Sequence, residues 1–185
     1  SDAMRATYPQ ALVSRQRIEW DIILWDENDV SGEAADAFFE MGLLHPSDWS
    51  ARWISGNYSV NPLKRYPVDC FQKKFETADV KKARMYVSAC GLYELVLNGE
   101  RVGDFVLAPG HTDYRKRVQC QTYDVTVLLK NGENVITAEL ADGWYRGSCG
   151  AWGLKNQYGK QTKLIVQLEI EKNDGTMQTL VSDGS

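Results

Sequence analysis

The sequence predicts an all-β protein folded as an antiparallel β-sandwich. Apolar and polar residues alternate in short runs, which is the pattern of strands that bury one face. Turn pairs such as Asn-Gly and Asp-Gly separate these runs, and no long stretch repeats with the 3.6-residue period of a helix. Many short strands joined by turns are typical of a sandwich of two antiparallel sheets.

The first alternating run is RIEWDIILW, residues 17–25. Its apolar residues are predicted to form one buried face, which comprises Ile18, Trp20, Ile22 and Leu24. A turn-rich segment follows, and residues 35–49 are compatible with either a helix or a strand. From Ala51 onward the pattern indicates strands only.

The next two strands are predicted over residues 83–89 and 93–97. In the first, Met85, Val87 and Ala89 fall on one face, and in the second Tyr93, Leu95 and Leu97 do so. Asn98-Gly99 follows directly, and this pair is the strongest short-range signal for a tight hairpin turn.

Two further strands are predicted over residues 134–141 and 163–171. The second alternates cleanly, with Leu164, Val166, Leu168 and Ile170 on one face. KNDGT, residues 172–176, is a second hairpin turn and leads into MQTLV. The chain stops at VSDGS soon afterwards, which leaves little sequence to complete or cover a sheet edge, so we expect an excised piece of a longer polypeptide. Whether the sandwich has all of its C-terminal strands stays open at this point.

Composition excludes several classes of partner. The chain has 185 residues, a length that suits either one domain of ordinary size or one domain plus part of another. It has 21 basic and 25 acidic side chains and a net charge of −4. No basic stripe indicates a nucleic-acid partner, and the most basic stretch, residues 65–84, is interpreted as a solvated face. No apolar run is long enough to predict a transmembrane helix.

The cysteines do not predict a zinc site. Four cysteines are widely spaced, no CxxC pair occurs, and the chain has only two histidines. Cys70, Cys90 and Cys120 lie in strand-like runs and are predicted to be buried free thiols.

The run DGWYRGSCGAWG, residues 142–153, is the principal candidate site. Aromatic rings stack on the apolar face of a sugar, while charged side chains bind its hydroxyl groups and glycines let the backbone come close. The residues that fit this chemistry are Asp142, Trp144, Tyr145, Arg146 and Trp152. The alternative is that the aromatic side chains pack against the core or a neighbouring domain, and the sequence leaves both hypotheses open.

A second loop, APGHTDYRKR at residues 108–117, is a candidate contact with a neighbouring domain. The residues proposed for that contact are His111, Asp113, Tyr114 and Arg115. The alternative is an ordinary hairpin crossing that starts at the Pro109-Gly110 turn.

These runs together resemble a known family. DWSARWIS, GLYELVLNGERVG, LAPGHTDYRKR, TYDVT, NGEN and GWYRG occur in the order and spacing of the N-terminal β-sandwich domain of bacterial α-L-rhamnosidases, glycoside hydrolase family 78. The resemblance covers roughly residues 48–185 and implies a jelly-roll-like, galactose-binding-domain-like sandwich. Residues 1–47 resemble the end of a fibronectin-III-like module, and SDA before Met4 looks like the remnant of an expression tag.

The resemblance implies a non-catalytic accessory domain. Whole enzymes of this family remove terminal α-L-rhamnose with inversion, and their paired carboxyl groups lie in a downstream (α/α)6 barrel that this sequence does not contain. Asp113 and Asp142 are the carboxylates that would have to face each other about 6.5–9.5 Å apart for hydrolysis. Acidic residues at strand ends usually cap turns, so we expect the chain itself to be inactive.

The expected partners are the catalytic domain of the same polypeptide and L-rhamnose-containing glycans. An autonomous rhamnose-binding module and a purely structural interdomain module remain alternatives. No cofactor is required, although Asp142 is a candidate oxygen ligand for Ca2+, an ion that a related rhamnose-binding module uses. No signal peptide is visible, and the compartment stays open between bacterial cytoplasm and periplasm.

Overall fold

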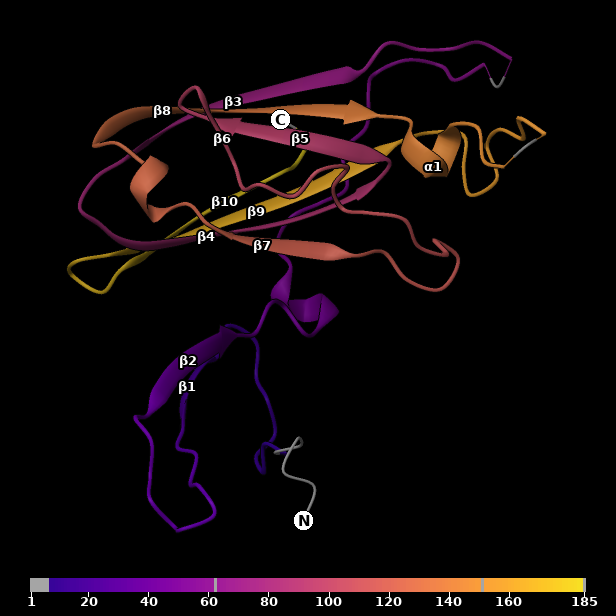
Figure 1. Cartoon of the computed structure of the whole chain (residues 1–185). Helices are drawn as coiled ribbons and strands as arrows, with labels where there is room; N and C mark the ends of the chain where they lie inside the picture. Colours follow the sequence, from indigo (N-terminus) through magenta and orange to yellow (C-terminus); the bar gives the residue numbers. More distant parts are fainter. Residues whose placement is uncertain (1–6, 62, 151, 185) are drawn as a thin grey trace. The chain divides into compact units, whose positions relative to one another are not determined.

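A computed structural model describes residues 7–61, 63–150 and 152–184 of the chain (Figure 1). The predicted tag remnant at residues 1–3 lies outside the described residues. The chain divides into two compact units, residues 1–48 and residues 49–185. No helix within the described part is long and apolar enough to cross a membrane.

The first unit contains one hairpin. Strands β1 (Arg17–Ile22) and β2 (Ala35–Glu40) pair antiparallel, with Arg17 opposite Glu40. The segment that the sequence left undecided between helix and strand is therefore a strand over Ala35–Glu40.

The buried face predicted for the first strand is largely wrong. Ile18 is 9% exposed, but Trp20 is 42%, Ile22 is 46% and Leu24 is 74% exposed. The physical reason is that a two-stranded ribbon has no second sheet within its own unit to cover its apolar face.

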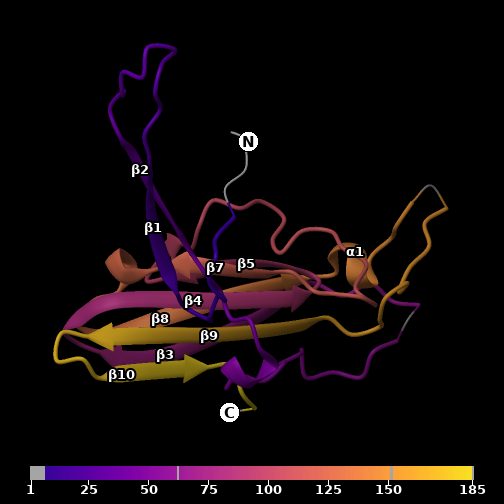
Figure 2. The same cartoon turned by 90° about the horizontal axis from the view of Figure 1, so that it is seen from below.

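The second unit is a sandwich of two four-stranded antiparallel sheets, which confirms the predicted fold class (Figure 2). One sheet has the order β10-β9-β4-β7, and its strands are β4 (Val80–Cys90), β7 (Cys120–Asp124), β9 (Lys163–Lys172) and β10 (Met177–Val181). The other has the order β3-β8-β5-β6, and its strands are β3 (Asp69–Thr77), β5 (Leu92–Leu97), β6 (Glu100–Arg101) and β8 (Gly132–Ala141). The described residues also contain three short helices: η1 (Pro46–Asp48) in the first unit, and η2 (Thr126–Leu128) and α1 (Gly143–Arg146) in the second.

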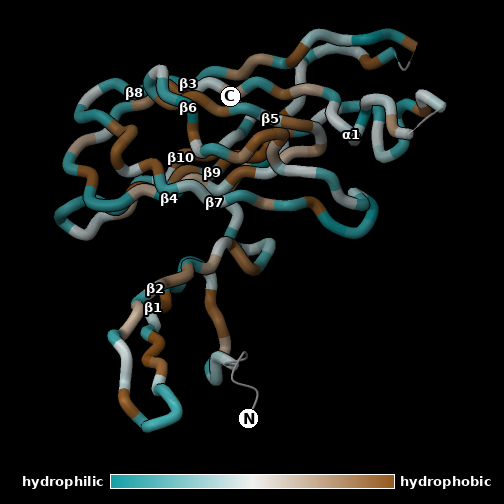
Figure 3. The backbone as a smooth tube through the Cα atoms, in the orientation of Figure 1, coloured by the Kyte–Doolittle hydropathy of each residue, from teal (hydrophilic) through white to brown (hydrophobic). Residues whose placement is uncertain are grey.

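The core lies between the two sheets and consists of the predicted alternating faces. Met85, Val87 and Ala89 of β4 are fully buried, and they belong to one cluster with Leu95 and Leu97 of β5. The remaining strands contribute Ala138, Leu140, Leu164, Leu168 and Ile170 to the same cluster. Hydrophobic stretches of the backbone, drawn brown in Figure 3, follow the facing strands, whereas the turns are more hydrophilic.

Both predicted hairpin turns are confirmed. Asn98 and Gly99 have φ values of 55° and 89°, the positive values that the tight turn between β5 and β6 requires. In the second turn, the amide of Lys172 donates to the carbonyl of Thr176 at 2.9 Å, and Gly175 has a φ of 83°.

Two predictions about surface and burial need correction. The stretch 65–84 is not simply a solvated face, because β3 turns Phe71 and Phe75 towards the core. Cys90 is buried as predicted, and burial raises the pKa of its thiol, but Cys70 and Cys120 are exposed because their side chains alternate onto the outer faces.

The antiparallel pairing gathers several strand ends at the same end of the sandwich. Leu92 at the start of β5 pairs with Ala141 at the end of β8, and Cys90 at the end of β4 pairs with Lys163 at the start of β9. The segments 56–68, 102–119 and 142–162 therefore all lead to strand ends at this end, next to α1 (Figure 1). We call it the loop end.

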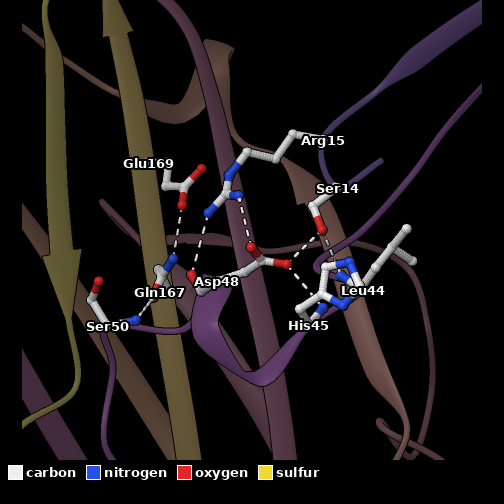
Figure 4. A network of polar contacts seen from close by, with 8 residues as sticks. All are labelled: Ser14, Arg15, Leu44, His45, Asp48, Ser50, Gln167 and Glu169. Atoms are coloured by element: carbon white, nitrogen blue, oxygen red, sulfur yellow. Dashed lines mark hydrogen bonds and ion pairs between the residues drawn. The ribbon is translucent and has the colours of Figure 1, made fainter. Parts of the chain in front are cut away.

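Two polar networks fix the segments around the end of the first unit and the start of the second (Figure 4). In the first unit, the Asp48 carboxylate accepts hydrogen bonds from the Ser14 hydroxyl at 2.5 Å and from the His45 amide at 2.9 Å. The bond from Ser14 is the main reason why the pKa of Asp48 is lowered. In the second unit, the Gln167 side chain accepts from the Ser50 amide at 2.7 Å and donates to Glu169 at 2.7 Å.

The core assignment predicts a contrast between two identical substitutions. Leu95 is 1% exposed and Leu63 is 90% exposed, so Leu95→Ala removes packed core atoms whereas Leu63→Ala removes solvated ones. We expect Leu95→Ala to lower the free energy of unfolding by about 2–5 kcal/mol. Leu63→Ala is expected to change it by less than about 0.5 kcal/mol. Urea unfolding of both variants checks this, and equal effects would contradict the assignment.

Candidate functional site

The candidate run begins at the end of β8, where α1 makes a single helical turn. Gly143 has a φ of 49°, and a Cβ there would lie 2.6 Å from the Leu92 side chain, so only glycine fits without displacing its neighbour. Gly147 ends the turn, and its amide donates to the carbonyl of Gly143 at 3.1 Å. Glycines thus bracket the three side chains Trp144, Tyr145 and Arg146.

Arg146 is the buried member of α1, at 5% exposure. Its Nε donates to Oδ1 of Asp142 at 2.6 Å, and its Nη1 donates to the Tyr58 hydroxyl at 3.0 Å. The Tyr58 hydroxyl in turn donates to Oδ2 of Asp69 at 3.2 Å. Burial alone would lower the pKa of Arg146, but the hydrogen bonds to Tyr58 and Asp142 outweigh it, and the pKa is raised.

The face of this arginine is also covered by an aromatic ring. The guanidinium carbon lies 5.1 Å from the centre of the Tyr66 ring, and that ring stacks on Tyr58 at 4.7 Å. The guanidinium is therefore held by an ion pair, a phenol and a ring, so its orientation is fixed before any ligand arrives.

A cavity of about 290 Å³ lies beside Arg146, and we call it the polar cavity. Its lining is mainly polar and basic and consists of Lys64, Arg65, Tyr66, Asp142, Arg146, Gly147, Ser148, Lys155 and Asn156. These residues come from two of the segments at the loop end.

The other side chains of α1 contact rings of the neighbouring loops. Trp144 meets His111 edge-on with ring centres 5.5 Å apart, and Tyr145 meets Tyr114 at 5.2 Å. Tyr114 also lies 5.1 Å from Tyr158. We call these five residues the aromatic cluster.

Residues of the predicted sugar site and of the predicted interdomain contact lie close together in the structure. They fall into two new groups that differ from the predicted ones. His111 and Tyr114 join Trp144 and Tyr145 in the aromatic cluster, whereas Asp142 and Arg146 line the polar cavity. Trp152 is 88% exposed and does not line that cavity.

The remaining two predicted residues form an ion pair at the surface. The Arg115 side chain lies 3.0 Å from the Asp113 carboxylate, which lowers the pKa of Asp113. The Arg115 guanidinium also lies 5.5 Å from the centre of the Tyr158 ring, at the rim of the aromatic cluster.

Sequence reasoning missed the partners that lie far from α1 in the chain. Tyr58 and Tyr66 hold Arg146, and Lys64, Arg65 and Lys155 line the polar cavity. The one signal in the sequence was the basic stretch from residue 65, which had been interpreted as a solvated face.

Each candidate carboxylate is paired with an arginine. Asp113 is occupied by Arg115, and Asp142 is occupied by Arg146. Within the described residues, no group of three or more His, Cys, Asp or Glu side chains could hold a metal ion.

The chain consists of a β-sandwich unit with a small β unit before it in the sequence. The family described as the α-L-rhamnosidase N-terminal domain matches residues 78–185, and the Rha78A-like N-terminal immunoglobulin domain matches residues 1–45. The chain belongs to the α-L-rhamnosidases of glycoside hydrolase family 78.

Individual relatives support the same family. An α-L-rhamnosidase of Streptomyces avermitilis is 53% identical over 165 residues, which cover 85% of this chain and 16% of the relative. An α-L-rhamnosidase of Formosa agariphila is 37% identical over 182 residues, 93% of this chain and 19% of the relative. The crystal structure of an α-L-rhamnosidase from Aspergillus terreus matches with a TM-score of 0.88 and 34% identity, over 95% of this chain and 21% of that one. The chain therefore spans about a fifth of the length of these relatives.

The two Arg–Asp pairs predict losses of stability of different size for the same substitution. Arg146→Met leaves Asp142 and Tyr58 without their donor in a buried site, so the free energy of unfolding should fall by about 1.5–3 kcal/mol. Arg115→Met breaks an exposed pair and should cost about 0–1 kcal/mol. Thermal and urea unfolding measure both, and a loss for Arg115→Met as large as that for Arg146→Met would contradict the burial argument.

Tyr114 predicts a loss of stability in alkali. Burial raises its pKa to about 12 in the folded protein, whereas an unfolded tyrosine ionises at about 10. Above about pH 10 the folded state therefore keeps a proton that the unfolded state loses. The contribution of Tyr114 to the free energy of unfolding is constant below about pH 10 and falls as the pH rises towards 12. Between pH 9 and pH 11, wild type should lose more unfolding free energy than Tyr114→Phe; parallel losses would refute this.

Proposed function

We propose that this chain is a non-catalytic accessory domain of an α-L-rhamnosidase, an enzyme that hydrolyses terminal α-L-rhamnose from glycosides. Its role is to pack against the catalytic domain of the same polypeptide and support it. The relatives named α-L-rhamnosidases are about five times as long as this chain, which leaves room for a catalytic domain outside it.

The observation that carries the proposal is an exposed apolar segment at 105–107. Phe105 is 48%, Val106 is 70% and Leu107 is 54% exposed, in a loop without strand or helix. Three consecutive exposed hydrophobic residues are unfavourable in water unless another surface covers them. The same loop continues into His111 and Tyr114 of the aromatic cluster.

A second apolar surface supports the same role. A cavity of about 520 Å³ lies between the sheets at the edge formed by β3 and β10. Apolar side chains dominate its lining, among them Phe71, Phe75, Leu168 and Leu180. A cavity of this size and character accepts apolar side chains from another part of a polypeptide.

The second candidate function is contact with carbohydrate. The polar cavity favours it, since Asp142 and Arg146 lie there beside Ser148 and Asn156, side chains that bind hydroxyl groups. Such a contact is compatible with packing against a catalytic domain, because the apolar segment and the polar cavity use different residues. Titration of the chain with neutral and acidic sugars tests this function.

The accessory role predicts an effect that only the full-length polypeptide can show. The double substitution Phe105→Ser and Leu107→Ser should lower the Tm and the rhamnosidase activity of the full-length enzyme, because it weakens the contact with the catalytic domain. In the 185-residue chain the same change should alter the free energy of unfolding by less than about 0.5 kcal/mol, since both residues are exposed.

Val127→Ser is the matched control, because Val127 is 90% exposed on η2. It should leave the full-length enzyme unchanged. Full activity and an unchanged Tm in the 105–107 variant would remove the support for packing through this segment.

A further inference from the structure

We propose that the polar cavity binds an acidic saccharide, through an oxyanion such as a carboxylate or a sulfate group on the sugar. This inference deepens the second candidate function and rests on it. It does not depend on the packing role.

The first argument is charge. Four of the residues that line the cavity are basic, Lys64, Arg65, Arg146 and Lys155, and only one, Asp142, is acidic. Arg146 pairs with Asp142, so the cavity retains three basic side chains. None of these three forms an ion pair with the residues that the structure describes, in a chain whose net charge is −4. Uncompensated cations around one hollow attract an anion.

The second argument is the state of Arg146. Its Nη2 atom is buried and forms an ion pair with Asp142, 2.6 Å from Oδ1. The guanidinium is already oriented by Tyr58 and Tyr66, so little freedom is lost on binding.

The third argument is that the rest of the lining suits a sugar ring. Ser148 and Asn156 offer a hydroxyl and an amide for sugar hydroxyl groups, and Tyr66 offers a ring. The cavity volume of about 290 Å³ lies at the lower end of small-molecule pockets, which start at about 300 Å³. One sugar residue with its charged group is therefore the expected occupant, rather than a long chain.

The test is a titration of the 185-residue chain, followed by 15N NMR and calorimetry at low ionic strength. The ligands are D-glucuronate and glucose 6-sulfate as the two acidic sugars, D-glucose and L-rhamnose as the neutral ones, and inorganic sulfate. We expect the acidic sugars to shift the amide signals of residues 64–66, 146–148 and 155–156. They should bind about tenfold more tightly than D-glucose, because charge-assisted bonds exceed neutral ones.

A double variant and a matched control test the location. Lys64→Gln with Lys155→Gln should weaken binding of the acidic sugars about fivefold by removing two of the cations. Lys116→Gln with Lys130→Gln removes the same charge at exposed positions outside the cavity and should leave affinity within about twofold. Equal weakening in both variants would mean non-specific attraction and would overturn the site.

The remaining outcomes separate this inference from the proposed function. If L-rhamnose and D-glucose bind in the cavity as tightly as D-glucuronate, the acidic preference is wrong while carbohydrate contact stands. If inorganic sulfate binds as tightly as glucose 6-sulfate, the cavity holds an adventitious ion only. If no ligand shifts these signals, both the inference and carbohydrate contact at this cavity fail, and the packing role is untouched.

Discussion

The burial of apolar faces between two antiparallel sheets is the constraint on which the rest of the second unit depends. Leu95 and Ala138 face the same core from paired strands, and a one-residue slip of either strand would turn its own apolar residues outward. The register therefore also decides where strands begin and end. Because the strand ends meet at the loop end, segments far apart in the sequence lie next to one another there.

The chemistry of the loop end follows from placing a buried arginine among those segments. Arg146 is stable in its site because Asp142 balances its charge and Tyr58 and Tyr66 cover it. The same pairing uses up the one acidic side chain that lines the polar cavity. Because Asp142 neutralises Arg146, the other basic residues that line the cavity have no acidic partner there. The cavity therefore carries an excess of positive charge.

The features that the sequence predicted correctly are those that depend on neighbouring residues. The alternation over residues 83–89 specifies the buried face of a strand, and the Asn98-Gly99 pair specifies a turn. Both signals are local in the sequence. The exposure of Trp20 could not be predicted in the same way, because alternation shows which side is apolar but not whether a second layer covers it. The bond between Arg146 and Tyr58 joins residues 88 positions apart, so only the pairing of the sheets could reveal it.

The crowding of aromatic and charged residues in GWYRG has a geometric explanation. Successive side chains of a helix point about 100° apart, so one turn sends three neighbours in different directions. Trp144 and Tyr145 meet the rings of the aromatic cluster, while Arg146 enters the buried network beside the polar cavity. Packing and ligand contact were alternatives when the run was treated as one site. In the structure, the ring contacts and the lining of the polar cavity involve different side chains of a single turn. Glycines at both ends let that turn fit against Leu92 and the end of β8.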